Sequence, residues 1–318
     1  MQDYTIDVII PTYKPGSELL STIDMLNKQT VKPNKIIIVD SLPDSNADTE
    51  GVKTAETLLA DRLSEYKVPV MIYNIDKGQF DHGGTRNQGV KHSDSRVFIC
   101  MTQDAIPAND VFIEALISPL ADKQVAVSYA RQLAKEDSSI EEQVARAFNY
   151  PEASCIKEAS DLDRLGIKTY FCSNVSCAYD AEIFANLGGF IDKTIFNEDM
   201  IYAAKAVKAG YKISYTAKAM VYHSHNYTPR QQFRRNVDIG VSQAQHPEVF
   251  DGLSSESEGK KLVMITMKRL VSEGRILRIP GFIWMIVNRY AGFLIGKHYK
   301  RFPISFIKKV SMNPGYFG

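Results

Sequence analysis

Short apolar runs alternate with amphipathic stretches along the first part of the chain. The runs at residues 6–10, 35–40, 68–75 and 96–101 have the length and continuous hydrophobicity of strands buried on both faces. The first run is expected to end at Pro11, which lacks a backbone N–H. Between them lie helical stripes, with apolar residues at Leu19, Ile23 and Leu26 and at Ala55, Leu58, Leu59 and Leu63. This alternation predicts an α/β fold with a mostly parallel, Rossmann-like sheet covered by helices.

The second half of the chain has a less regular pattern. Apolar runs predict further strands at residues 125–130, 170–179 and 214–223. Helical periodicity predicts helices at residues 140–148, 181–187 and 200–209, the last of which is expected to end at Gly210. We therefore expect the sheet to continue into a second part of the same domain.

Polar residues follow four of the predicted strands at their carboxyl ends. These residues are Thr12, Asp40, Asp76 and Asp104. Open α/β sheets bind ligands in the crevice outside the carboxyl ends of their strands. Each residue alone is also explained as a turn or capping residue, but together they predict a ligand site along one edge of the sheet.

The composition places the chain among globular proteins. It has 318 residues, of which 44% are hydrophobic and 24% charged. Its four cysteines form no CxxC pair, so neither a zinc site nor a disulfide framework is indicated. The first residues do not resemble a secretory signal, which leads us to expect a cytosolic protein.

The formal net charge of +1 conceals an uneven distribution. Residues 260–318 contain seven Lys and five Arg against one acid, Glu273, and so carry +11, which leaves −10 for residues 1–259. An acidic body with a basic tail is indicated. Because the body offers no large positive groove, nucleic-acid binding is not expected.

Six short motifs occur in order along residues 4–240, and together they resemble the family 2 inverting glycosyltransferases of the GT-A fold. The motifs are Val8-Ile-Ile-Pro-Thr-Tyr13, Val39-Asp40-Ser41, Gly83-Gly-Thr-Arg-Asn87, Gln103-Asp104-Ala105, Asn197-Glu-Asp199 and Val221-Tyr-His223. The resemblance implies a GT-A domain at residues 1–250, with a nucleotide-binding part at about 1–105 and an acceptor-binding part at about 106–250. A basic amphipathic helical tail would follow at residues 251–318.

Two segments are most similar to the rhamnosyltransferases of bacterial cell-wall and capsular polysaccharides. They are residues 80–87, from Phe80 to Asn87, and residues 223–227, from His223 to Tyr227. This similarity implies dTDP-β-L-rhamnose as the donor, an α-L-rhamnosyl product, and a lipid-linked glycan containing rhamnose as the acceptor. A family 2 transferase with a UDP-hexose donor is one alternative. A non-catalytic scaffold descended from a transferase is another.

A divalent cation is expected, because a nucleotide diphosphate leaves with negative charge that Mg²⁺ or Mn²⁺ can neutralise. Asp104 stands where the family holds its metal, although the family's Asp-x-Asp is Thr102-Gln103-Asp104 here. His223 is the preferred second ligand, as in the family pattern. His225 would share a face with it on an extended strand, so the choice between the two histidines stays open.

Inversion requires a base that takes the proton of the acceptor hydroxyl, and Asp199 matches the family's base position. Its neighbour Glu198 is the alternative, or else a residue that favours the start of a helix.

The resemblance also implies contacts with the nucleotide donor. Arg86 would reach a phosphate, Asp40 the ribose or base, and Asp76 the thymine ring, while the Gly83 loop would allow the donor to approach the backbone. Of the neighbouring pair Arg234 and Arg235, one is expected to point inward, and Arg234 is the residue we assign to the donor. The full set of predicted donor residues is Pro11, Thr12, Tyr13, Asp40, Asp76, Gly83, Arg86, Gln103, Asp104 and Arg234.

The tail contains an apolar stretch at residues 276–296 that is interrupted by polar residues, namely Arg278, Asn288 and Arg289, and by Pro280. The interruptions make it a poor membrane-spanning segment. With basic residues close behind, it predicts an element that lies on anionic lipid at the inner face of the cell membrane. The alternative is packing against the acidic body or a homodimer interface.

Overall fold

A computed structural model describes residues 5–43, 53–253 and 256–318 of the chain. The sheet begins with four strands and three helices in strict alternation, as the apolar runs predict. These are β1 (Ile6–Tyr13), α1 (Ser17–Asn27), β2 (Lys35–Leu42), α2 (Ala55–Leu59), β3 (Val70–Asp76), α3 (His82–Lys91) and β4 (Val97–Met101).

The second part adds five strands to the same sheet. Its elements are β5 (Ile106–Pro107), α4 (Phe112–Ile117), β6 (Val125–Leu133), α5 (Ile140–Asn149), β7 (Cys155–Lys157), α6 (Leu162–Leu165), β8 (Ser176–Asp180), α7 (Ala181–Asn186), α8 (Glu198–Lys208), β9 (Lys212–Tyr222) and α9 (Pro229–Gln245). Four helices complete the described chain, namely α10 (Pro247–Phe250), α11 (Glu256–Ser272), α12 (Ile279–Lys297) and α13 (Ile304–Val310).

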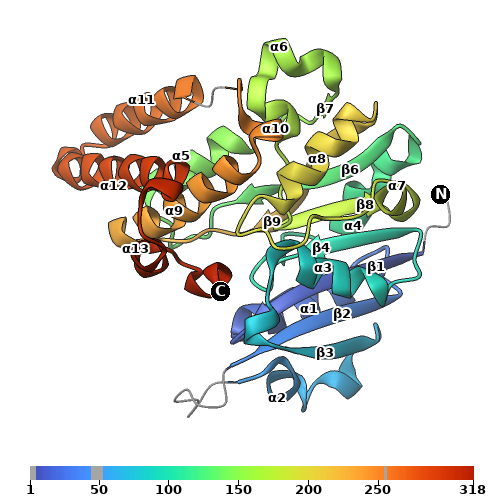
Figure 1. The fold of residues 1–318 in the computed structure, drawn as a ribbon. Coiled ribbons are helices and arrows are strands. Elements are labelled where there is room, and N and C mark those ends of the chain that lie inside the picture. The colour runs from blue at the N-terminus through green and yellow to red at the C-terminus, as the bar shows by residue number, and fades with distance from the viewer. Residues whose placement is uncertain (1–4, 44–52, 254–255) are drawn as a thin grey trace.

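The strand order is β3-β2-β1-β4-β8-β6-β9-β5, with β7 paired to β9 (Figure 1). The pairings β1–β2, β1–β4, β2–β3 and β6–β9 are parallel, and β8 runs antiparallel to both β4 and β6. Among the described residues, six strands therefore share one direction, and only β5, β7 and β8 oppose it. The prediction of an α/β fold with a mostly parallel sheet is confirmed.

Each central strand is buried on both faces, which explains its continuous hydrophobicity. In β1, Val8 and Ile10 pack into a cluster with α1, α2 and α4 on one face of the sheet. Ile9 packs into a second cluster, with α7 and α8, on the other face. The sheet is thus the middle of three layers, with helices packed on both of its faces.

Two predicted strand boundaries are wrong, for physical reasons. β1 runs on through Pro11 to Tyr13, because its pairing with β4 stops at Ile9 while its pairing with β2 continues. A proline is tolerated where a strand has lost one neighbour. The strand predicted at residues 170–179 is formed only from Ser176 to Asp180. The residues before it turn away from the sheet toward α8, where they contribute to the site described below.

The tail helices lie at the end of the sheet remote from β3, where α12 packs on α9 (Figure 1). The two helices approach so closely that a Cβ at Gly292 would lie 2.2 Å from the Phe233 carbonyl oxygen, and one at Gly296 would lie 2.1 Å from that of Val237. Only glycine permits this contact. Gly296 follows Gly292 by one helical turn, and Val237 follows Phe233 by one turn in the same direction. The two helices therefore run parallel to each other, and α12 packs tightly against α9.

Candidate active site

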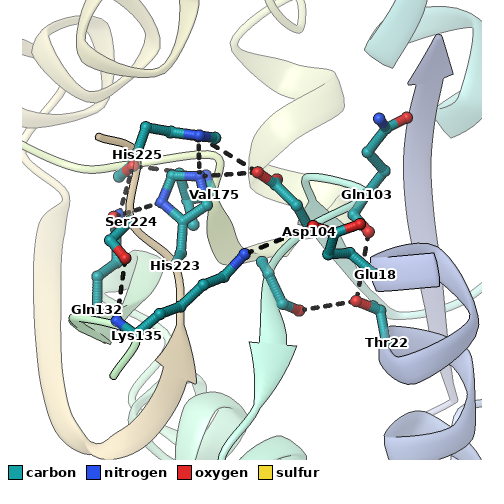
Figure 2. Close-up of polar contacts among 12 residues, drawn as sticks. Glu18, Thr22, Gln103, Asp104, Gln132, Lys135, Val175, His223, Ser224 and His225 are labelled. Carbon is teal, nitrogen blue, oxygen red and sulfur yellow. Dashed lines mark hydrogen bonds and ion pairs between the residues drawn. The ribbon is translucent and has the colours of Figure 1, made fainter. Parts of the chain in front are cut away.

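Three side chains converge beyond the ends of β4 and β9. Asp104 follows β4, while His223 and His225 follow β9 directly. Figure 2 shows them pointing at one another. The Asp104 Oδ2 lies 3.6 Å from His223 Nε2 and 3.2 Å from His225 Nε2, and the two Nε2 atoms are 3.1 Å apart. The structure therefore brings both candidate histidines to Asp104, where the sequence left the choice open.

These separations fit a divalent cation. At a metal–ligand distance of about 2.1 Å, two ligands lie about 3.0 Å apart at a right angle and about 3.4 Å apart at the tetrahedral angle. Two of the observed separations, 3.1 and 3.2 Å, fall within this range, and the third, 3.6 Å, lies slightly above it. Two imidazoles and one carboxylate form a donor set that Mn²⁺, like other divalent transition metals, accepts. The residues present thus fit the metal that the motifs imply.

A hydrogen-bond network orients His223. Its Nδ1 lies 3.1 Å from Gln132 Oε1, an acceptor that Arg146 Nη1 also approaches. Gln132 Nε2 is fixed by donating to Tyr150 Oη at 2.6 Å. Since the amide oxygen can only accept, His223 carries its proton on Nδ1 and turns the lone pair of Nε2 toward Asp104.

Both imidazoles are held neutral, as metal ligands must be. Burial lowers the pKa of His223 to about 3, although Asp104 acts in the opposite direction. Burial likewise lowers the pKa of His225. Thr102 stands at the first carboxylate of the family's pair, and the neighbouring Gln103 takes no part in the cluster, because its amide exchanges hydrogen bonds with the backbone of Tyr13. His225 lies where it could provide a third donor atom to a cation.

Two carboxylates, Glu198 and Asp199, lie at the start of α8, and their surroundings shift their pKa values in opposite directions. Asp199 is half-buried, and its two oxygens accept from the backbone N–H groups of Asn174 at 2.9 Å and Met200 at 2.8 Å. Burial, and next the negative charge of Glu198, raise the pKa of Asp199 to about 7. A carboxylate with this pKa is suited to accept a proton near neutral pH.

Glu198 is already committed to other groups. It is buried, and its Oε1 lies 3.2 Å from Arg86 Nη1 and 3.0 Å from Asn174 Nδ2. Burial alone would raise the pKa of Glu198, but Arg86 and then His82 outweigh it and hold that pKa below its usual value. Glu198 therefore stays ionised and paired, which leaves Asp199 as the carboxylate that changes protonation.

The predicted donor residues at the ends of β1 and β2 form a connected group. Thr12 donates to Asp40 Oδ1 at 2.6 Å, and the other oxygen of Asp40 accepts from the Ala55 N–H at 2.7 Å. Asp40 is buried, so both of its oxygens serve the structure. Pro11 and Tyr13 continue the same strand end, and Tyr13 is exposed. Donor contact by these residues stays a prediction.

Two other predicted donor residues have structural roles that sequence reasoning did not anticipate. A Cβ at Gly83 would lie 1.9 Å from the Ile191 carbonyl oxygen, so this glycine allows contact between two chain segments. Arg86 is buried against Glu198 and also donates to the His82 carbonyl oxygen at 2.7 Å, so it is not free for a phosphate. Asp76, at the end of β3, is exposed.

Arg234 also departs from its assignment. Its guanidinium donates to the Ser311 carbonyl oxygen in the tail, so the inward-facing arginine of the pair is Arg235. Arg235 lies 4.5 Å from the ring centre of Phe196 and 5.9 Å from that of Tyr227. On a helix, adjacent residues point about 100° apart, so the sequence alone did not decide between them.

Gln132 and Asn174 are positions beside the site that sequence reasoning did not identify, and Arg235 is the member of the arginine pair that it did not choose. Gln132 lies at the end of β6 and Asn174 in the loop before β8, each distant in sequence from the residue it orients. Asn174 contacts both carboxylates, and its Oδ1 accepts from Tyr179 Oη at 2.7 Å. The polar Ser173-Asn174 step inside an otherwise apolar run was the available signal, because a buried strand rarely carries an amide without a partner.

Comparison with known proteins identifies the family. Residues 7–188 match the family described as Glycosyl transferase family 2. The chain is 38% identical to the O-antigen chain rhamnosyltransferase RfbN of Salmonella typhimurium strain LT2, over 98% of this chain and 96% of that protein. It is 36% identical to the O-antigen chain rhamnosyltransferase WbaN of Salmonella anatum, over 100% of this chain and 96% of that protein.

Solved structures agree on the fold. The mannosyltransferase PcManGT from Pyrobaculum calidifontis, in complex with GDP-Man and Mn²⁺, aligns with a TM-score of 0.60 at 13% identity, over 93% of this chain and 88% of that one. S. aureus TarS 1-349 aligns with a TM-score of 0.55 at 14% identity, over 97% and 84%. With its motifs, its sheet and its full-length relatives in agreement, this chain is a member of the family 2 glycosyltransferases and has the GT-A fold.

Proposed function

We propose that the protein transfers L-rhamnose from dTDP-β-L-rhamnose to a hydroxyl of a rhamnose-containing, lipid-linked glycan, with inversion at the sugar carbon. The identity of 38% and 36% to two O-antigen chain rhamnosyltransferases, over nearly the whole chain, supports the choice of sugar. The observation that carries the chemistry is Asp199, a carboxylate whose pKa is raised to about 7, in a chain that also brings Asp104, His223 and His225 together. A scaffold without activity would have no use for that combination.

The reaction follows from the two groups of side chains. The acceptor oxygen attacks the anomeric carbon on the face opposite the diphosphate, and its proton passes to Asp199. The bond from that carbon to the diphosphate oxygen breaks, and its electron pair leaves on dTDP. Asp199 is held by two backbone N–H groups, so its oxygens stay in place during the transfer. Attack from the opposite face converts the β-linked donor into an α-linked product.

Asp104, His223 and His225 would hold Mn²⁺ or Mg²⁺. When bound, such an ion supplies positive charge to the departing diphosphate. The presence of Mn²⁺ in the PcManGT complex supports this assignment. The neutral state of both imidazoles and the outer support of His223 by Gln132 support it independently.

The donor is tested by calorimetric titration of the full chain with dTDP-rhamnose, UDP-glucose and UDP-N-acetylglucosamine, each with Mn²⁺ and with EDTA. We expect metal-dependent binding of dTDP-rhamnose and weaker binding of both UDP-sugars. A preference for a UDP-sugar would retain the transferase and overturn the rhamnosyl assignment. Absence of binding by all of them would favour the non-catalytic scaffold.

We further place the protein on the inner face of the cell membrane, through the outer face of α12. Ile283, Trp284, Val287 and Tyr290 form a stripe there, and each side chain is 50% to 60% exposed. Cations flank the stripe at both ends, from Arg275 and Arg278 to Lys300 and Arg301. An exposed apolar stripe between cations is complementary to anionic lipid.

The segment Ile276–Lys297 is also long and apolar enough to cross a membrane, judged by length and composition. Its glycine face is closely packed on α9, however, and Arg278 lies 3.4 Å from Glu141 of the body. These contacts favour a helix that lies on the surface. The exposed face is apolar rather than basic, so the amphipathic pattern that we expected for the tail is only partly present.

Trp284 is the single tryptophan of the chain, so its fluorescence reports on this face directly. We expect vesicles of phosphatidylcholine mixed with phosphatidylglycerol to shift the emission to shorter wavelength, because the indole moves from water into the lipid interface. Vesicles of phosphatidylcholine alone and added salt should reduce the shift. No shift with anionic vesicles, together with a dimer in sedimentation, would favour the dimer interface instead.

A further inference from the structure

Residues 193–197, the base loop, lead directly into α8 and have an uncommon backbone conformation at both ends. Lys193 and Asn197 have positive φ angles of 56° and 64°, in the left-handed region that residues other than glycine rarely adopt. Such conformations cost free energy and persist only where the surrounding structure enforces them. Asn197 immediately precedes Glu198 and Asp199, so the position of Asp199 depends on how the base loop is held.

The second half of the base loop is held by α9. Asn197 Nδ2 donates to Ser242 Oγ at 3.0 Å, and Ser242 Oγ in turn donates to the Phe196 carbonyl oxygen at 2.7 Å. Ser242 is buried, and so is Ile195, whose side chain packs on the same helix. These contacts account for the left-handed residue at the α8 end of the base loop.

The Lys193 end is held by the C-terminal segment, residues 311–317. The Tyr316 hydroxyl donates to the Lys193 carbonyl oxygen at 2.9 Å and lies 2.9 Å from Gln245 Oε1 of α9. The Tyr316 side chain also packs against the apolar cluster that contains Ile195. The second left-handed residue of the base loop is thus held by a side chain 123 residues further along the chain.

The C-terminal segment is itself fixed to α9. Arg234 Nε donates to the Ser311 carbonyl oxygen at 2.9 Å, and Asp238 Oδ2 accepts from the Met312 N–H at 3.0 Å. Ser311 and Asp238 are both buried. Figure 1 shows this red end of the chain beside α13. Because the segment is anchored shortly before Tyr316, the hydroxyl of Tyr316 has a defined position over the base loop.

We propose that Tyr316 is a positioning residue for the base Asp199. Its hydroxyl holds the Lys193 carbonyl, which keeps the base loop in its left-handed conformation and Asp199 in place at the start of α8. Tyr316 acts through the loop and does not touch the reacting atoms. The contact with the base loop stands on geometry, whereas its effect on turnover rests on the proposed function. The tail would then support the active site as well as the proposed membrane surface.

The test compares Tyr316→Phe with Tyr66→Phe in the full chain. Tyr66 Oη donates to Asp24 Oδ1 at 3.1 Å on the opposite face of the sheet, so the control removes a similar hydrogen bond elsewhere. Hydrogen exchange followed by mass spectrometry measures the base loop without relying on activity. We expect Tyr316→Phe to speed exchange in residues 193–200 by about two- to tenfold, the range for the loss of one hydrogen bond, and Tyr66→Phe to leave it unchanged.

Turnover is the second readout. We expect Tyr316→Phe to lower kcat by about tenfold, because a displacement of about 1 Å can cost up to about 10²-fold. Affinity for dTDP-rhamnose should stay unchanged. The midpoint of the pH profile should fall, since burial is the largest cause of the raised Asp199 pKa of about 7 and a looser loop admits water. Glu198 raises and Arg86 lowers the same pKa, and the variant removes neither.

The outcomes separate this inference from the proposed function. Equal exchange in Tyr316→Phe and Tyr66→Phe would overturn the proposal. So would a lower melting temperature in Tyr316→Phe with the kcat and pH midpoint of the wild type, because that result assigns Tyr316 to stability alone. A wild type that transfers no sugar would instead count against the proposed function, and faster exchange of the base loop in Tyr316→Phe would still support the contact.

Discussion

Replacing Asp199 with asparagine is expected to lower kcat by about 10²- to 10⁴-fold, the usual contribution of a general base. The change keeps the shape of the side chain and the hydrogen bond from at least one of the two backbone N–H groups that hold it. Affinity for dTDP-rhamnose should therefore stay within about twofold, since only an interaction made during the transfer is lost. Turnover assays and donor titration on the same preparation measure both quantities.

The wild-type pH profile provides a second check on Asp199. Only the ionised carboxylate can take the acceptor's proton, and burial together with Glu198 raises its pKa to about 7. Below that pH the protonated form dominates, so kcat/KM should rise with pH through about 7 and then level off. His223 does not interfere, because burial lowers its pKa to about 3. A profile that is flat between pH 5 and pH 9 would remove Asp199 from the role of base, since a pKa of about 7 falls inside that interval.

Glu198→Gln is the matched control, because Glu198 was the alternative base. Glu198 is buried against Arg86, and removing one charge of a buried pair leaves the other without compensation. We expect this variant to lower the melting temperature, whereas Asp199→Asn should leave it nearly unchanged. Wild-type turnover in Asp199→Asn, with loss of turnover in a folded Glu198→Gln, would exchange the two assignments.

The sequence predicted the parts of the fold that depend on local pattern. Continuous apolar runs identified the central strands, because a strand buried on both faces has no polar side. The pattern failed at residues 170–175, where the chain leaves the sheet so that the Asn174 N–H and side chain can reach Asp199 and Glu198. A contact of that kind depends on tertiary structure and leaves little trace in a hydrophobic pattern.

The same distinction applies to the site. Asp104 and His223 could be placed because each follows a strand whose end was predictable, and parallel strands bring their carboxyl ends to one edge. Gln132 and Arg235 could not be placed, since their roles depend on a side-chain direction rather than on position along an element. Residues that orient the site are thus harder to find by sequence than the residues they orient.

Removing any one of the three predicted metal ligands is expected to weaken Mn²⁺ binding strongly. Loss of an outer-shell partner alone typically costs about 10- to 100-fold in metal affinity, so loss of a ligand should cost at least that much. The variants Asp104→Asn, His223→Gln and His225→Gln should all show this, because all three donor atoms lie within 4.8 Å of one another. Calorimetric titration with Mn²⁺ in the presence of dTDP measures the affinity without relying on activity.

Two further variants serve as controls for the Mn²⁺ titration. Gln132→Met tests the loss of an outer-shell partner, and His92→Gln tests the loss of a histidine away from the cluster. Gln132 contacts no metal but accepts from His223 Nδ1, so its loss should weaken Mn²⁺ by about 10- to 100-fold, the range for an outer-shell partner. His92 stacks on Tyr73 away from the cluster, and its replacement should leave Mn²⁺ affinity unchanged. If His225→Gln binds Mn²⁺ as the wild type does, Asp104 and His223 alone hold the ion. If none of the three ligand variants differs from His92→Gln, the cluster is not a metal site, and the leaving diphosphate must be stabilised by other groups of the protein.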